Sequence, residues 1–261
     1  MKTWWITIAA VVMLAAAPSA QWIKYPTPGI PRTADGKPNL AAPAPKLADG
    51  KPDLSGLWLT QGIYIGNIAK DLKADEVPFQ PWAAELYKQR LANQGKDDPT
   101  GRCVVGGVPR STAVPYPFKI QHATSGIVLI LYEAVHSYRQ IFTDGRPLPK
   151  DPNPAWFGYS VGHWEGETLI VESAGFNDNV WLDNSGHPAG ESLRVTERFR
   201  RKDFGHASVE VTIDDPKTYT KPWTVTIPLI FQPDTEMIEY MCPENEKDYD
   251  RLVGSTPAKG K

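Results

Sequence analysis

Charged residues interrupt four otherwise apolar, strand-like segments of this 261-residue chain: Glu133, Arg139, Glu172 and Glu197. A carboxylate inside an apolar cavity has a raised pKa and can act as a general acid or base near neutral pH. Glu197 is expected to point inward, because Val195 and Phe199 on the same strand face are apolar. The alternation leaves Glu172 facing either the interior or water. In the competing interpretation these acids pair with Arg139 or Arg198 on the outer face.

Two histidines are candidates for the general acid that would act together with one of these carboxylates as base. His163 shares a strand face with Tyr159 and Val161, which predicts either a hydrogen-bonded barrel residue or a proton shuttle. His187 follows Asp183 and Asn184 in a Gly-His-Pro loop, and a loop histidine near acids is the sharper candidate. Together with Asp178 and Trp181, His187 is expected to close over a ligand as a lid.

Aromatic residues gather in the same part of the chain, residues 154–187, together with polar loop residues. Large aromatics with convergent polar groups are what a concave ligand site requires, although a barrel core requires them too. The expected ligand-binding residues are Trp156, Tyr159, Trp164 and Trp181, with Tyr138 and Arg139 from an earlier strand.

Motifs for a metal or a nucleotide are not found. The Asn and Asp residues at 177–179 and 183–184 suit calcium oxygen ligands, but their spacing matches no EF-hand, and such residues build turns without an ion. No HExxH, CxxC or GxGxxG pattern occurs. We therefore expect neither a cofactor nor a bound metal.

The N-terminus predicts export. Lys2 precedes an apolar run from Trp4 to about Ala17, with small residues before Gln21, which is typical of a secretory signal peptide over residues 1–20. A periplasmic or extracellular location follows. The formal charge of −2, with both signs scattered, argues against a nucleic-acid partner. No later segment is apolar enough to span a bilayer, so we expect a soluble monomer or weak homodimer.

The two cysteines, Cys103 and Cys242, predict a disulfide. In an exported chain oxidising conditions favour pairing, and no CxxC or Cys/His cluster suggests another role. The bridge is expected to hold the C-terminal segment against the body of the protein.

The organisation expected is a Pro-rich extended tail over 21–52, with an ADGKP turn motif at 34–38 and again at 48–52, followed by one mainly β domain over 53–261. Residues 81–96 predict one helix, with Trp82, Leu86 and Leu91 as its apolar stripe. Strands are expected at 117–124, 127–134, 137–143, 158–165, 168–174, 192–201, 206–213, 223–231 and 236–242. Short links between them predict an antiparallel up-and-down barrel of about eight strands; a sandwich or jelly roll is the alternative.

Gly56-Leu57-Trp58, at the start of this strand run, resembles the Gly-x-Trp opening of lipocalins and other calycin-type barrels. The hairpin HWEGETLIVES at 163–173 is similar to late hairpins of fatty-acid-binding barrels. The string WFGYSVGHWEGETL also resembles uncharacterised exported bacterial proteins. The lipocalin resemblance implies a ligand cavity at the open end of a barrel, with Trp58 packed as a plug at the closed end.

The sequence thus favours an exported protein that binds a small hydrophobic or aromatic molecule in the barrel mouth. The alternative is a cofactor-independent lyase or isomerase on the same scaffold, with Glu197 or Glu172 as base, His163 or His187 as acid, and Trp164 and Trp181 as substrate walls. A third class is an envelope or assembly component that uses the Pro-rich tail as a tether.

Overall fold

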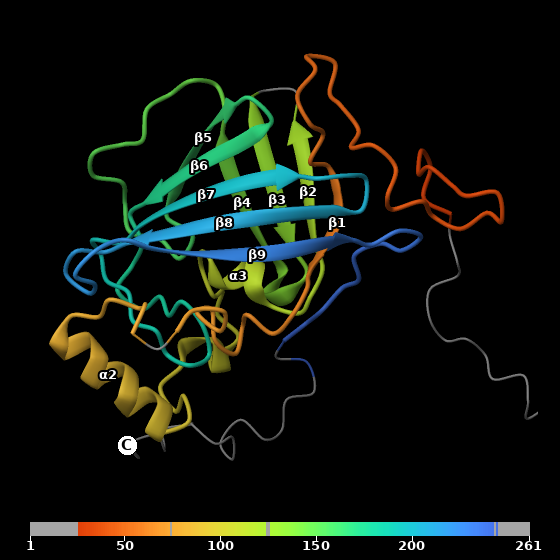
Figure 1. Cartoon of the computed structure of the whole chain (residues 1–261). Helices are drawn as coiled ribbons and strands as arrows, with labels where there is room; N and C mark the ends of the chain where they lie inside the picture. Colours follow the sequence, from red (N-terminus) through yellow and green to blue (C-terminus); the bar gives the residue numbers. More distant parts are fainter. Residues whose placement is uncertain (1–25, 74, 124–125, 243, 245–261) are drawn as a thin grey trace, which may run out of the picture.

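Nine strands close into a single barrel in the computed structural model, which describes residues 26–73, 75–123, 126–242 and 244 (Figure 1). The strands are β1 Gly56–Thr60, β2 Phe118–Ala123, β3 Ile127–Tyr132, β4 Ser137–Phe142, β5 Tyr159–Glu165, β6 Thr168–Ala174, β7 Arg194–Arg201, β8 His206–Asp214 and β9 Trp223–Phe231. The prediction of a mainly β closed barrel is confirmed, and the sandwich alternative is wrong. The predicted signal peptide lies outside the described residues.

Strand β4 runs parallel to β5, whereas every other neighbouring pair of the barrel is antiparallel. An odd number of strands cannot close with antiparallel neighbours alone, because the strand direction must then repeat once around the ring. The parallel ladder contains only Ile141↔Ser160 and Phe142↔Val161, while the β5–β6 ladder contains seven residue pairs. The predicted all-antiparallel meander is therefore wrong at one seam, and that seam is the weakest part of the wall.

Trp58 closes one end of the barrel. Its ring is 0% exposed, its Nε1 donates to the Leu54 carbonyl at 2.9 Å, and Phe231 meets it edge-on at 5.5 Å. The Arg201 guanidinium lies 4.9 Å from the ring centre, and burial lowers the pKa of Arg201 to about 10. The packing predicted for Trp58 from the lipocalin resemblance is therefore present.

The opposite end, expected to be an open mouth, is covered by α3, Arg110–Ala113, below the strands (Figure 1). All four α3 residues are buried. Thr60 at the end of β1 donates through Oγ1 to the Thr112 carbonyl at 2.5 Å, and the Thr112 hydroxyl lies 3.4 Å from the Tyr132 hydroxyl. Helix α3 thus packs across this end of the barrel, and a pocket of about 290 Å³ lies beside its residues Arg110 and Ser111.

Helix α2 spans Pro81–Ala92, inside the predicted 81–96, but the predicted apolar stripe is wrong. Trp82 and Leu91 are exposed, at 52% and 48%, and the helix buries Ala83 while half-burying Tyr87 and Arg90 on the same face. Two short 3₁₀ turns, η1 Pro99–Arg102 and η2 Ala134–His136, complete the helical elements of the described residues.

The two ADGKP motifs form matching turns, as predicted. In the first, Gly36 N–H donates to the Thr33 carbonyl at 2.9 Å, and in the second, Gly50 N–H donates to Leu47 at 2.9 Å. Between them, the carbonyls of Leu40 and Ala42 accept from Gly205 and Phe204. This part of the predicted tail therefore packs on the barrel.

The predicted disulfide between Cys103 and Cys242 is present. The segment 236–242, predicted as a strand, is not one; Ile238 N–H donates to the Glu133 carboxylate at 3.1 Å, and Tyr240 N–H donates to His136 Nε2 at 3.3 Å. These contacts and the disulfide fasten the segment to the barrel without strand pairing. Within the described residues, no helix has the length and apolarity needed to cross a membrane.

Candidate functional site

A buried ion pair crosses the interior of the barrel. Arg139 on β4 and Glu197 on β7 approach to 2.5 Å between Nη2 and Oε2, and their side chains are 1% and 0% exposed. Between these strands, Arg139 Nε donates to Ser160 Oγ on β5 at 3.0 Å, and Nη2 donates to Ser173 Oγ on β6 at 2.7 Å. The inward orientation predicted for Glu197 is confirmed, and Arg139 extends beneath two strands to reach it.

The charge of Arg139 is maintained by its neighbours. Burial alone lowers the pKa of Arg139, but the Glu197 carboxylate and the Tyr132 hydroxyl outweigh burial, so the pKa lies above its ordinary value. Burial in the same interior raises the pKa of Tyr132. The pair therefore consists of a guanidinium beside a carboxylate, with a neutral phenol nearby.

Part of the hydrogen-bonding capacity of this pair is unused among the described residues. Arg139 Nη1 and both Glu197 carboxylate oxygens are buried and lack an aligned hydrogen-bond partner. The contact to Oε2 is close enough for an ion pair but is not aligned as a hydrogen bond. A buried polar group left without a partner costs about 1–3 kcal/mol. The pair can therefore accept a further polar group, and would be stabilised by one.

A gap in the barrel wall reaches Arg139, one member of this pair. A pocket of about 280 Å³ lies along the β4–β5 seam and is lined by Tyr138, Arg139, Gln140, Phe142, Phe157, Gly158, Tyr159 and Ser160. Inward-facing Arg139 and Ser160 line it together with outward-facing Tyr138 and Gln140, so it lies where these two strands separate. The short parallel ladder explains the gap, because the first half of β4 has no ladder partner on β5.

Gly158, which lines this wall gap, packs closely against Ala174 of β6. Its φ is +61°, and a Cβ at this position would lie 2.6 Å from the Ala174 carbonyl oxygen. Only glycine tolerates both the left-handed backbone and the close approach. The residue thus fixes the path of the chain as it enters β5.

Aromatic rings surround the wall gap. Phe157 stacks on Tyr132 with ring centres 5.5 Å apart and planes 9° apart, and Phe142 stacks on Tyr159 at 5.1 Å. Arg146 covers Phe142 at 4.0 Å and donates to the Tyr159 hydroxyl at 3.0 Å. The wall gap thus combines flat apolar surfaces with a polar interior end.

Four residues predicted from the sequence meet at this site: Tyr138, Arg139 and Tyr159 line the wall gap, and Glu197 contacts Arg139. Glu172 and His163 do not join them. Both are exposed on the outer face of the barrel, where His163 lies 3.3 Å from Glu165. The interpretation of these two residues as cavity residues is therefore wrong.

None of the three predicted tryptophans lines the wall gap. Trp164 stacks on His122 at 6.3 Å near the Trp58 end, with Lys51 over its ring at 5.9 Å. Trp156 is partly buried against the core. Trp181 lies under the Arg90 guanidinium at 3.9 Å, and with Asp178 it lines a separate pocket of about 280 Å³ beside α2.

His187 forms a second buried pair, with Asp183. Its Nδ1 lies 2.6 Å from Asp183 Oδ2, and the two side chains are 2% and 0% exposed. Asp183 also accepts the backbone N–H groups of Ile68, Gly186 and His187, at 2.7, 3.0 and 3.2 Å. Tyr87 packs on the imidazole with ring centres 4.3 Å apart. His187 therefore lies inside the loop packing beneath the barrel, and it is not exposed as the predicted lid would require.

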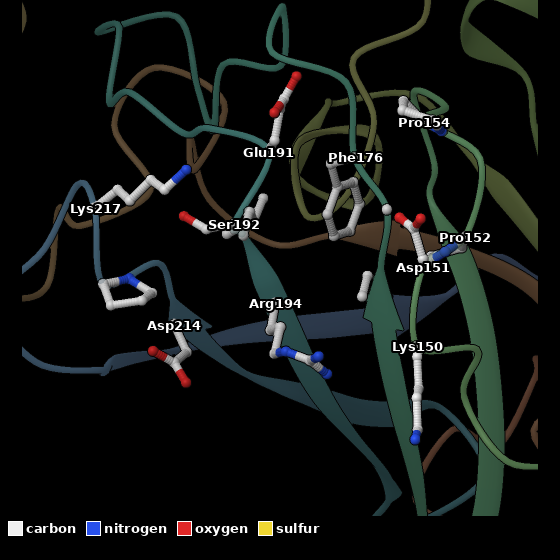
Figure 2. Close-up of a pocket in the computed structure, with 14 residues that line it drawn as sticks. Lys150, Asp151, Pro152, Pro154, Phe176, Glu191, Ser192, Arg194, Asp214 and Lys217 are labelled. Atoms are coloured by element: carbon white, nitrogen blue, oxygen red, sulfur yellow. The ribbon is translucent and has the colours of Figure 1, made fainter.

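A groove with a volume of about 560 Å³, larger than the wall gap, lies elsewhere on the surface (Figure 2). Lys150 and Asp151 form one wall, Asp214 and Lys217 form the other, and Arg194 and Phe176 lie between them (Figure 2). Most of these charged side chains are exposed, so water satisfies their hydrogen bonds. The groove contains no residue predicted from the sequence, and it offers a weaker reason for a ligand than the buried atoms at Arg139 and Glu197.

The fold and site define the class of protein as a closed nine-stranded β-barrel with a polar pair behind a gap in its wall. No protein-family model, curated protein or solved structure matches the chain. Function is therefore argued from the site itself.

Proposed function

We propose that this protein is an exported binding protein for a small apolar or aromatic molecule, which it holds in the wall gap between β4 and β5. The observation that carries the proposal is that one pocket joins the outward-facing aromatics Tyr138 and Tyr159 to the buried Arg139. A ligand pocket that is mostly apolar with few, well-placed polar groups is the usual form of a small-molecule site.

The dimensions of the wall gap suit a small ligand. An apolar cavity of about 150 Å³ is enough to hold benzene. The gap, at about 280 Å³, therefore suits one substituted ring, or two small ones. Four aromatic side chains, those of Tyr138, Phe142, Phe157 and Tyr159, line the gap and offer ring surface to such a ligand.

Binding is favoured over the alternative of acid–base catalysis. That alternative needs an acid beside Glu197, and its two candidates lie elsewhere: His163 on the outer face and His187 against Asp183 below the barrel. Arg139, which does contact Glu197, remains protonated and is a poor proton donor near neutral pH. The pair is thus suited to hold a ligand.

Export is supported by the Cys103–Cys242 disulfide, since such bonds persist in oxidising compartments. Expression of the full chain in a bacterium with a secretion pathway is expected to yield a mature protein that begins at Gln21. Intact-mass measurement of the periplasmic fraction tests this. A full-length chain recovered from the cytoplasm would contradict export.

The binding proposal is tested by native mass spectrometry on protein purified from its own source, where a co-purifying small apolar or aromatic molecule is expected. Tyr138→Ala removes an aromatic residue that is 64% exposed at the wall gap and is expected to reduce occupancy at least about fivefold. Ile63→Ala is the matched control, because Ile63 is 74% exposed and does not line the gap. Equal occupancy in the two variants would place the ligand outside the gap.

A further inference from the structure

We infer that the ligand carries an uncharged group which both donates and accepts hydrogen bonds, a hydroxyl or a primary amide on an aromatic ring, and that this group binds between Arg139 and Glu197. The inference rests on the proposed function and specifies its ligand class. It follows from three properties of the pair: its unused atoms, its net charge and its surroundings.

The unused atoms define a donor and an acceptor. Arg139 Nη1 has hydrogens to give, and Glu197 Oε1 has lone pairs to receive. Ser160 and Ser173 do not take these roles, because Ser160 Oγ and Ser173 Oγ meet Arg139 through Nε and Nη2 and lie 2.9 Å from each other. A partner that satisfies both unused atoms must accept from Nη1 and donate to Oε1. A hydroxyl and a primary amide each do both.

The charge balance excludes an ionised group. Arg139 and Glu197 lie 2.5 Å apart and neutralise each other. The interior therefore has no remaining charge with which an ionised ligand could pair. A carboxylate placed here meets the Glu197 carboxylate, and an ammonium meets the Arg139 guanidinium. Either one would also bring an uncompensated charge into an interior where the pair is at most 1% exposed. A neutral head group avoids both penalties.

The surroundings favour an aromatic carrier. Ser160, which hydrogen-bonds Arg139, lines the same pocket as Phe157 and Tyr159. A molecule whose polar group reaches the pair through the gap therefore leaves its remainder among aromatic rings. Phenol and benzamide are the smallest molecules that meet all three conditions.

The experiment measures the binding of five probes to the full mature chain by isothermal titration calorimetry: phenol, benzamide, benzoate, benzylamine and toluene. Phenol and benzamide are expected to bind at least about tenfold more tightly than benzoate and benzylamine, and more tightly than toluene. If none of the five binds, the proposed function fails. If toluene binds as well as phenol, the proposed function stands and the inference is overturned. The unused atoms of Arg139 and Glu197 would then not recognise the hydroxyl of the ligand.

Glu197→Gln provides the decisive variant. It leaves Arg139 without its counter-charge, so the preference is expected to invert, with benzoate gaining at least about tenfold over its affinity for the unmodified protein. Glu172→Gln is the matched control, because Glu172 is exposed on the outer face of the adjacent strand β6, and it is expected to change no affinity. A Glu197→Gln protein that folds and still rejects benzoate would overturn the inference.

A second variant covers the case in which Glu197→Gln does not fold. Arg139→Met with Glu197→Leu removes both charges together, and such replacements of a buried pair are usually tolerated. This double variant is expected to bind toluene as tightly as phenol. Retained selectivity for phenol would show that another group recognises the hydroxyl.

Discussion

Two buried polar pairs of nearly equal burial, one inside the barrel and one beneath it, differ in how completely they are partnered. Asp183 and His187, below the strands, share a 2.6 Å contact, and Asp183 accepts three backbone N–H groups. Arg139 and Glu197, inside the strands, leave Arg139 Nη1 and the Glu197 oxygens without an aligned partner in the described protein. The first pair organises a loop, and the second keeps hydrogen-bonding capacity for a ligand.

The largest effect on the free energy of unfolding is expected when Asp183 and His187, the fully partnered pair, are both replaced by apolar residues. Asp183→Leu with His187→Phe keeps the aromatic stack but leaves the N–H groups of Ile68 and residue 187 without an acceptor, while Gly186 N–H keeps only its 3.3 Å bond to the residue 183 carbonyl. At about 1–3 kcal/mol for each of the two groups, the free energy of unfolding is expected to fall by roughly 2–6 kcal/mol, with a further loss at Gly186. Urea denaturation measures this. A loss below about 1 kcal/mol would mean that the loop does not depend on Asp183.

Removing one member of the barrel pair is expected to have the next largest effect. Glu197→Leu leaves the Arg139 guanidinium buried without a counter-charge, which costs about 3–5 kcal/mol of unfolding free energy. The same denaturation experiment applies, with Glu172→Leu on the outer face as the control. Equal stability of the two variants would contradict the assignment of Glu197 to the interior.

The contrast between the pairs becomes sharpest when both members of the barrel pair are replaced. Arg139→Met with Glu197→Leu is expected to leave the free energy of unfolding within about 1 kcal/mol of the unmodified protein, or higher, because no backbone group loses its partner and Ser160 and Ser173 still bond to each other. A loss comparable to that of the loop double variant would contradict the proposed difference between the two pairs. It would show that Arg139 stabilises the fold mainly by joining β4 to β5 and β6 through Ser160 and Ser173.

A smaller, pH-dependent effect is expected at His122, a histidine whose nearest hydrogen-bonding partner is a backbone group. Its Nε2 accepts the Leu54 N–H at 3.2 Å, which requires that this nitrogen carry no proton. Burial lowers the pKa of His122 in the folded state, outweighing Asp53 and Asp49. The unfolded chain therefore takes up the proton first as pH falls, and stability declines from about pH 6.5 downward.

Thermal melts of the protein between pH 8 and pH 5 test this, with His122→Gln as the comparison. The variant is expected to lose part of the decline in melting temperature on the acid side, because Gln keeps an acceptor that does not titrate. The exposed His163 provides the control through His163→Gln, which is expected to keep the full decline. Parallel curves for His122→Gln and the unmodified protein would contradict the account.

Much of the fold could be predicted because it follows from local patterns. Alternation of apolar residues located eight of the strands, and the apolar residues flanking Glu197 predicted its inward orientation correctly. The parallel seam could not be predicted, because the pairing of Ile141 with Ser160 joins segments separated by a long loop and has no local signature. The wall gap is a consequence of that seam, so the position of the site could not be predicted from the sequence either.

The errors at β5 and β6 have a different cause. Val161 and Ile170 are buried although they share the outer face with His163 and Glu172, because that face is itself partly covered. When both faces of a strand bury apolar residues, alternation no longer separates inside from outside. The Asp183–His187 pair had a usable signal, since the two residues are four apart in a turn-rich loop, but nothing local indicated that backbone groups would complete it.

The most direct test of the central claim is a crystal structure of the mature protein with 4-bromophenol, in which anomalous scattering locates the bromine. The account predicts one bromine peak in the wall gap near Tyr138 and Tyr159, with the phenol oxygen within hydrogen-bonding distance of Arg139 Nη1 and Glu197 Oε1. A bromine peak only in the surface groove beside Arg194, with an ordered water between Arg139 and Glu197, would contradict it.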